Sequence, residues 1–128
     1  MTHAHPTVAR ELLAFARELA DRPGAATRGL WPRAAVLLAR QSLEVALKTY
    51  WSAKARGVEE SSMRAQLLCL GPWLSDDDLA RQAHQVWGVL SDASHYHPYD
   101  LAPTREEILV WCESVQAVIE VTEKAWRR

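Results

Sequence analysis

Apolar residues recur every three or four positions along most of the chain, which is the spacing of amphipathic α-helices. The pattern predicts a first helix over about residues 7–20, capped by Thr7 and ended before Pro23-Gly24. Its inward stripe is predicted to be Val8, Leu12, Phe15 and Leu19. A longer helix is predicted over about residues 31–55, with Pro32 in its first turn and Gly57 at its end. Its predicted inner face is Ala35, Leu38, Ser42, Val45, Ala46 and Thr49.

Three more helices follow. A short one over about residues 61–70 is predicted to stop at Gly71-Pro72, and the next is predicted to start after Ser75 as its cap. That helix must end by His97, because a residue before proline disfavours helix. The last helix begins at Thr104, with Glu107 at capping-box spacing. The apolar stripes of the last two helices are Leu79, Ala83, Val86, Trp87 and Leu90, and then Ile108, Trp111, Cys112, Val115, Val118, Ile119, Thr122 and Trp126.

No run of strict apolar and polar alternation is long enough for a pair of strands. Four main helices and one short helix, joined by short links, predict an all-α antiparallel bundle. A chain of 128 residues fits one domain over 1–128 and can bury a real core.

Composition narrows the range of functions. A net charge of −1 argues against a strongly electrostatic binder of nucleic acid or membranes, and the sequence carries no DNA-specific signal. No apolar run approaches the roughly 18 residues of a membrane span, and the first residues lack the parts of a signal peptide. Cys69 and Cys112 lie in apolar helical patterns, so we expect two small buried side chains in a reducing cytoplasm.

The six tryptophans divide into two sets. Trp87, Trp111 and Trp126 fall on predicted inner stripes and are expected in the core. Trp31, Trp51 and Trp73 lie near helix ends, where they either plug the bundle or form a homodimer face, since tryptophan is enriched at interfaces.

Candidate chemistry concentrates at the end of the fourth predicted helix. Residues 92–100 hold two histidines, two tyrosines and two aspartates: Asp92, His95, Tyr96, His97, Tyr99 and Asp100. Helix geometry places Asp92 and His95 on one face with Arg81, His84 and Gly88. His97 is predicted to lie near the apolar stripe, at the mouth of the core, where its pKa can be tuned for proton transfer.

Three chemistries could use this segment. Asp92, His95, His97 and Asp100 could share a metal ion, although the chain has neither HExxH nor a Cys/His pair at finger spacing. A histidine beside a tyrosine or aspartate could act in general acid–base catalysis. Nucleophilic attack by Ser91 or Ser94 would need a correctly placed base. No glycine-rich phosphate loop is present, and we expect no metal and no cofactor.

The helix order, with a polar residue, four spacers and a histidine from Asp92 to His97, resembles the HEPN superfamily. That superfamily comprises small, often dimeric helical domains that include metal-independent RNases of toxin–antitoxin and other defence systems. The stretch from His95 to Thr104 also resembles small actinobacterial proteins. The HEPN motif has an arginine, four to six residues and a histidine, so the resemblance implies that His97 handles a proton. His95, Tyr99 or an arginine from elsewhere in the chain would assist it.

This chain departs from that motif, because Asp92 stands in the arginine position and Ala93 follows it. A carboxylate there repels phosphate. Arg81 and Arg105 are the nearest substitutes in the sequence and could instead pair with Asp92. Three hypotheses follow. The first is a non-catalytic or weakly catalytic HEPN-like module that dimerises and binds RNA or protein. The second is a metal-independent endoribonuclease using His97, and the third is a small-ligand binder using His97 and Tyr99.

Overall fold

The computed structural model describes residues 7–21, 30–95 and 101–127. Over these ranges the protein is all-helical and has no strand, so the predicted all-α class is confirmed. Its elements are α1 (Val8–Asp21), α2 (Trp31–Lys54), the 3-10 helix η2 (Val58–Glu60), α3 (Met63–Leu74), α4 (Asp77–Ser94) and α5 (Arg105–Trp126).

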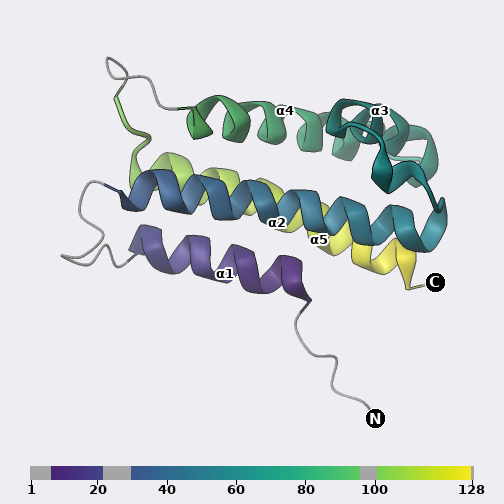
Figure 1. The fold of residues 1–128 in the computed structure, drawn as a ribbon, viewed down its shortest axis with the longest axis horizontal. Helices are drawn as coiled ribbons and strands as arrows, with labels where there is room; N and C mark the ends of the chain where they lie inside the picture. The colour runs from purple at the N-terminus through teal and green to yellow at the C-terminus, as the bar shows by residue number, and fades with distance from the viewer. Residues whose placement is uncertain (1–6, 22–29, 96–100, 128) are drawn as a thin grey trace, which may run out of the picture.

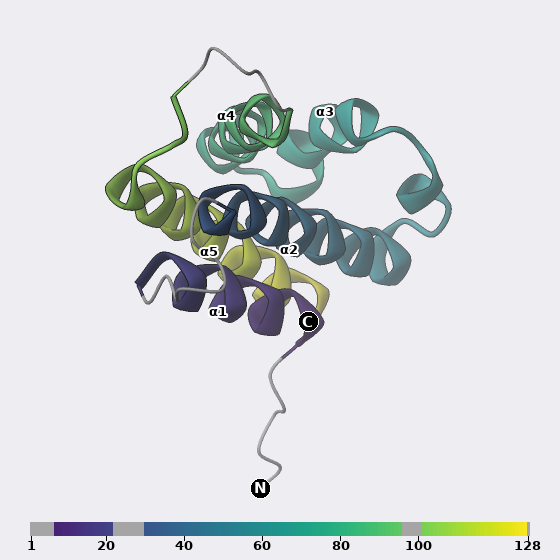
Figure 2. The same cartoon turned by 60° about the vertical axis from the view of Figure 1, so that its left-hand side comes forward.

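The helices pack in three layers, with α2 and α5 in the middle, α1 on one side and α3 with α4 on the other (Figures 1 and 2). Helix α2 packs against α1, α4 and α5, and α3 packs chiefly on α4. In Figure 1, α1 and α4 run in one direction and α2 and α5 in the other. The end of α4, the start of α5 and the start of α2 therefore lie at the same end of the molecule.

Local sequence signals set several helix boundaries correctly. Thr104 accepts the backbone N–H of Glu107 at 3.1 Å, and the Glu107 carboxylate accepts the N–H of Thr104 at 3.0 Å, which is the predicted capping box. The Thr7 hydroxyl accepts the N–H of Arg10 at the start of α1. The predicted stripe of α4 is also buried, except that Trp87 is only partly covered: Leu79, Ala83, Val86 and Leu90.

The predicted inward stripe of α1 is wrong by one position. Ala9, Leu13, Ala16 and Ala20 are buried, whereas Val8 is 58% exposed and Phe15 is 57% exposed. Small residues face α2, and the Ser42 hydroxyl of α2 donates a 2.6 Å hydrogen bond to the carbonyl of Ala9. Alanine side chains are small enough to permit this close approach, so the stripe of mostly small residues faces α2 and the neighbouring stripe of larger side chains does not.

The predicted inner face of α2 needs a similar correction. Thr49 is exposed and Leu38 and Val45 are only partly buried. The buried set is wider because helices cover α2 on several sides: Pro32, Ala35, Val36, Ala39, Ser42, Leu43, Ala46, Leu47, Tyr50 and Trp51.

The tryptophans were also assigned wrongly. Trp51, expected at an end of the bundle, is fully buried, with its ring edge-on to Tyr50 and Trp73. Trp87, Trp111 and Trp126, expected in the core, are only partly buried against it.

Helix α3 continues through the residues predicted to end it. Gly71 is buried where α3 meets α4, and a Cβ atom at Gly71 would lie 2.9 Å from Oδ1 of Asp77. Gly71 therefore lies at a close contact between the two helices, where a Cβ atom would require the Asp77 side chain to shift. Pro72 is exposed and lies inside α3, which ends two residues later at Leu74. Ser75, the predicted cap of α4, instead adopts a left-handed conformation with φ 54° after the end of α3. The cap of α4 is Asp76, whose side chain accepts the N–H of Leu79.

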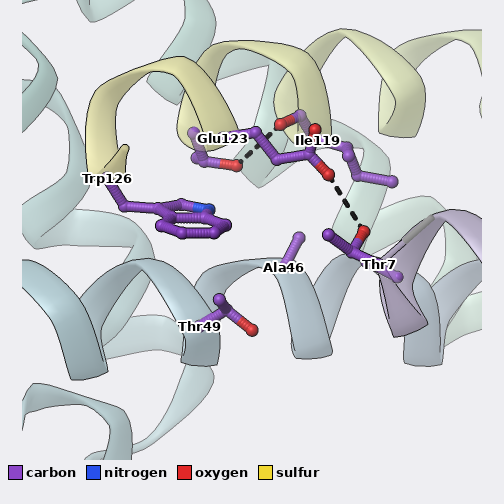
Figure 3. Close-up of a pocket in the computed structure, with 8 residues that line it drawn as sticks. Thr7, Ala46, Thr49, Ile119, Glu123 and Trp126 are labelled. Atoms are coloured by element: carbon purple, nitrogen blue, oxygen red, sulfur yellow. Dashed lines mark hydrogen bonds between the residues drawn. The ribbon is translucent and has the colours of Figure 1, made fainter. Parts of the chain in front are cut away.

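A buried carboxylate that the sequence analysis did not predict ties α1 to α5. Glu123 lies among the buried residues of α5 (Figure 3). Its carboxylate accepts hydrogen bonds from Nε of Arg10 at 2.9 and 3.0 Å and from the Thr7 hydroxyl at 2.9 Å. Burial alone would raise the pKa of Glu123, but the Arg10 and Thr7 hydrogen bonds and the Arg10 charge outweigh burial and lower it.

A Glu123→Gln variant tests this link. Because the pKa of Glu123 is lowered in the folded protein, its contacts with Arg10 and Thr7 stabilise the fold fully above the unfolded pKa of about 4.3. This stabilisation is lost as the pH falls through the lower pKa of the folded state. We expect the variant to lose about 2 kcal/mol at pH 7, because Arg10 then faces a neutral amide. The difference in the free energy of unfolding between wild type and the variant should narrow below about pH 4. Urea unfolding at several pH values measures both effects.

Asp78→Asn is the matched control, since Asp78 pairs with Arg81 at 3.1 Å on the surface. Its cost should stay below about 1 kcal/mol. A gap between wild type and Glu123→Gln that is constant from pH 7 to pH 3 would contradict the ion-pair account.

Candidate functional site

An open groove of about 720 Å³ lies at the end of the bundle where α2 begins, α4 ends and α5 begins. Its apolar lining includes Leu30, Val89, Ala93, Leu101 and Trp111. Its ionisable lining is Arg33, Asp92, His95 and Glu107. The lining thus combines apolar side chains with ionisable side chains of both charge signs.

The end of α4 turns His95 out of the helix. The Ser94 hydroxyl is buried and donates to the carbonyl of Leu90 at 2.7 Å, so it is occupied within the helix. His95 follows with extended backbone angles, φ −81° and ψ 130°, and its N–H reaches the carbonyl of Asp92 at 3.2 Å. Asp92 and His95 are both exposed and both line the groove, as their shared helix face predicts.

Arg33 is the groove residue that sequence reasoning missed. It lies in the first turns of α2, about sixty residues from Asp92, yet lines the same groove. Only the antiparallel course of α2 and α4 brings the start of one beside the end of the other (Figure 1). The sequence shows an arginine directly after Pro32 at the start of a helix. It does not show that the end of α4 lies beside that helix start.

The two arginines nearest Asp92 in the sequence are engaged elsewhere. Arg81 pairs with Asp78 near the start of α4, far along the helix from His95. Arg105 donates to Asp21, which ties the start of α5 to the end of α1. His84 is exposed on α4 and does not line the groove. The structure therefore does not gather Arg81, His84 and Arg105 around Asp92.

Tyr96, His97, Tyr99 and Asp100 lie outside the described residues. Within residues 7–21, 30–95 and 101–127, no three histidine, cysteine, aspartate or glutamate side chains come close enough to hold a metal ion. The metal hypothesis for Asp92 and His95 thus gains no third ligand from the described part of the chain.

The seam between α2 and α4 holds a second polar group, at Ser91. Its hydroxyl oxygen is buried and has no hydrogen-bond partner among the described residues, and the same is true of Nε1 of Trp87 one turn earlier. The guanidinium of Arg40 lies over the Trp87 ring at 5.9 Å. No described base contacts Ser91, so the arrangement does not activate it as a nucleophile.

The pocket beside Glu123 is too small for a ligand. It is lined by Thr7, Ala46, Thr49, Ile119 and Trp126 among others, and its volume is about 10 Å³ (Figure 3). That space matches one water molecule at most. The Arg10–Glu123 pair therefore belongs to the scaffold.

The two cysteines differ, contrary to the expectation that both are buried. Cys112 is buried in α5, and burial is the main cause that raises its pKa to about 11. Cys69 is exposed on α3. A thiol with a raised pKa is a poor nucleophile, so Cys112 is a core side chain.

Thiol labelling of the native protein tests this difference. With Ellman's reagent at pH 8 we expect the folded chain to react at Cys69 alone, because the Cys112 thiol is neutral and covered. The second thiol should appear after denaturation. Cys69→Ser should remove the native reaction, and a rapid native reaction in that variant would contradict the buried position of Cys112.

Comparisons of this chain with protein-family models, with curated proteins and with solved structures each found no match. No helix in the described ranges is both long enough and apolar enough to cross a bilayer. The class that the fold defines is an all-helical domain with an open groove at one end of its bundle.

Proposed function

We propose that this chain is a HEPN-like helical module that homodimerises through the end-of-bundle groove and binds a protein partner. In this proposal it cleaves RNA weakly or not at all. The observation that carries the proposal is the groove itself, which lies at the end of α4, where the HEPN resemblance places its polar motif. A cytoplasmic location fits this role.

The charges of the groove suit a second copy of the same chain. Arg33 supplies a positive charge in the same lining as the two carboxylates of Asp92 and Glu107, and His95 lies with them. An isologous interface brings the same patch onto itself, so a patch that carries both signs can pair with its own copy. A groove for RNA would instead need a surplus of cations.

Exposed apolar side chains at the groove supply the energy for association. Leu101 is 97% exposed and Leu30 is 67% exposed, and both line the groove with partly covered Val89 and Trp111. Burying one leucine side chain contributes about 1.5–3 kcal/mol. Aromatic anchors such as Trp111 commonly carry much of the energy at the centre of an interface.

The carboxylate of Asp92 argues against efficient phosphodiester chemistry at the groove. It lies exposed on the groove beside His95, where a HEPN RNase has a phosphate-binding arginine. A negative charge at that place disfavours the developing charge of a phosphoryl transition state. The module is therefore proposed to act by association.

A single substitution at the groove tests the dimer. We expect sedimentation equilibrium to show a wild-type dimer and Leu101→Glu to weaken it by about tenfold or more, because the change places a charge in an apolar contact. Leu68→Glu is the control, since Leu68 is a leucine that is also exposed, at 67%, on α3 and outside the groove lining. A wild-type monomer, or equal weakening by both variants, would contradict the proposal.

A metal-independent RNase is the second candidate, and the position of Arg33 favours it. Arg33 lines the groove together with His95, so a cation for phosphate is present although it has no place in the motif. In this alternative His97 acts as the general acid or base.

RNA cleavage in EDTA separates the two candidates. We expect no cleavage by wild type and new activity in Asp92→Arg, because the substitution replaces a repelling carboxylate by a phosphate-binding cation. Wild-type cleavage that disappears in both His97→Ala and Arg33→Ala would instead establish the RNase. Circular dichroism of each variant confirms that the helices remain folded.

A further inference from the structure

Helix α1 carries a seven-residue repeat that produces two parallel apolar stripes. The tetrad Ala-Arg-Glu-Leu at residues 9–12 recurs at residues 16–19. The first stripe holds mostly small residues and faces the core: Ala9, Leu13, Ala16 and Ala20. The second has the four-three-four spacing of a coiled-coil seam and larger side chains: Val8, Leu12, Phe15 and Leu19.

The second stripe lies on the flank of α1 away from α5. Arg10 bonds Glu123 of α5, and helix geometry places Val8 and Phe15 on the other side of the buried stripe. Leu12 and Leu19 are partly covered, while Val8 is 58% and Phe15 is 57% exposed. A seam of this spacing normally faces another helix.

Helix α2 extends the apolar surface across the boundary between the two helices. Phe15, Leu19 and Leu38 line one depression together. Val45 lies seven residues after Leu38, on the same face of α2, and is also only partly buried. We call this surface the α1–α2 strip, comprising Val8, Leu12, Phe15, Leu19, Leu38 and Val45.

The charges beside the strip are unequal on its two edges. Glu11 and Glu18 are exposed along the α1 edge, at the same repeat position. The α2 edge carries exposed Gln41 and Lys48, which face the same side as each other at seven-residue spacing. A helix lying on the strip therefore meets two carboxylates along one flank and little net charge along the other.

We propose that the α1–α2 strip binds an amphipathic helix of a partner protein, with an apolar heptad seam and Lys or Arg along the flank that faces α1. The strip provides apolar contact area, and Glu11 and Glu18 select the basic flank. A second copy of α1 is disfavoured, because antiparallel pairing of the seams would set its glutamates against Glu11 and Glu18. This inference supplies the protein partner that the proposed function requires, on a different surface from the groove.

Two synthetic helical peptides of roughly three heptads provide the probe. Both carry leucine at the seam and glutamine elsewhere, and they differ only in having lysine or glutamate along one flank. Fluorescence anisotropy of the labelled peptide measures binding to the full-length chain. We expect the lysine peptide to bind at least about tenfold more tightly than the glutamate peptide.

Two variants place the binding on the strip. Phe15→Ser removes an exposed ring and should weaken binding of the lysine peptide by about tenfold. The double variant Glu11→Lys with Glu18→Lys should reverse the preference between the peptides. The matched controls are Leu68→Ser on α3 and Glu113→Lys on α5, both at exposed positions, and neither should change binding.

Equal binding of both peptides, or undiminished binding by Phe15→Ser, overturns the inference. It is also overturned if Phe15→Ser dissociates a dimer seen by sedimentation, since a second copy would then occupy the strip. Peptide selectivity in a chain that is monomeric at every concentration keeps this inference and overturns only the groove dimer. A groove dimer without peptide selectivity overturns this inference and keeps the groove dimer of the proposed function.

Discussion

The close packing of α2 against α1, α4 and α5 is the constraint on which the rest of the structure depends. Alanines at positions 35 and 39 of α2 and 9 and 16 of α1 are all buried, and their small size lets the helices approach closely. The hydrogen bond from Ser42 to the carbonyl of Ala9 shows how near the two backbones lie. Phe15, on the neighbouring stripe of α1, is consequently displaced to the edge of the bundle.

That displacement explains the surfaces on which function is proposed. Because alanines occupy the inner face of α1, Phe15 and its neighbours on the heptad remain on the outside. Because α2 and α4 run in opposite directions, Arg33 reaches the groove that Asp92 and His95 line. The partly buried Arg10–Glu123 pair then fixes α1 to α5, so that both surfaces keep their orientation on one scaffold.

Local chemistry made the helix boundaries predictable. The capping box of Thr104 and Glu107, the cap at Thr7 and the stripe of α4 depend on residues within one or two turns of each other. Gly71 and Pro72 misled the prediction for the opposite reason. A glycine that ends a helix in isolation can instead serve a close contact with a second helix, as Gly71 does beside Asp77.

By itself, the sequence determined that the chain is all-helical, where most of its helices begin and end, and that its polar segment follows α4. The tertiary structure decided which stripe of α1 is buried, that Trp51 is core while Phe15 is not, and that Glu123 meets Arg10. The physical reason is that sequence periodicity reports local structure, whereas packing depends on residues far apart in the chain. Periodicity reports that a helix has an apolar side, but α1 has two adjacent apolar stripes. Only the space left by α2 and α5 selects between them.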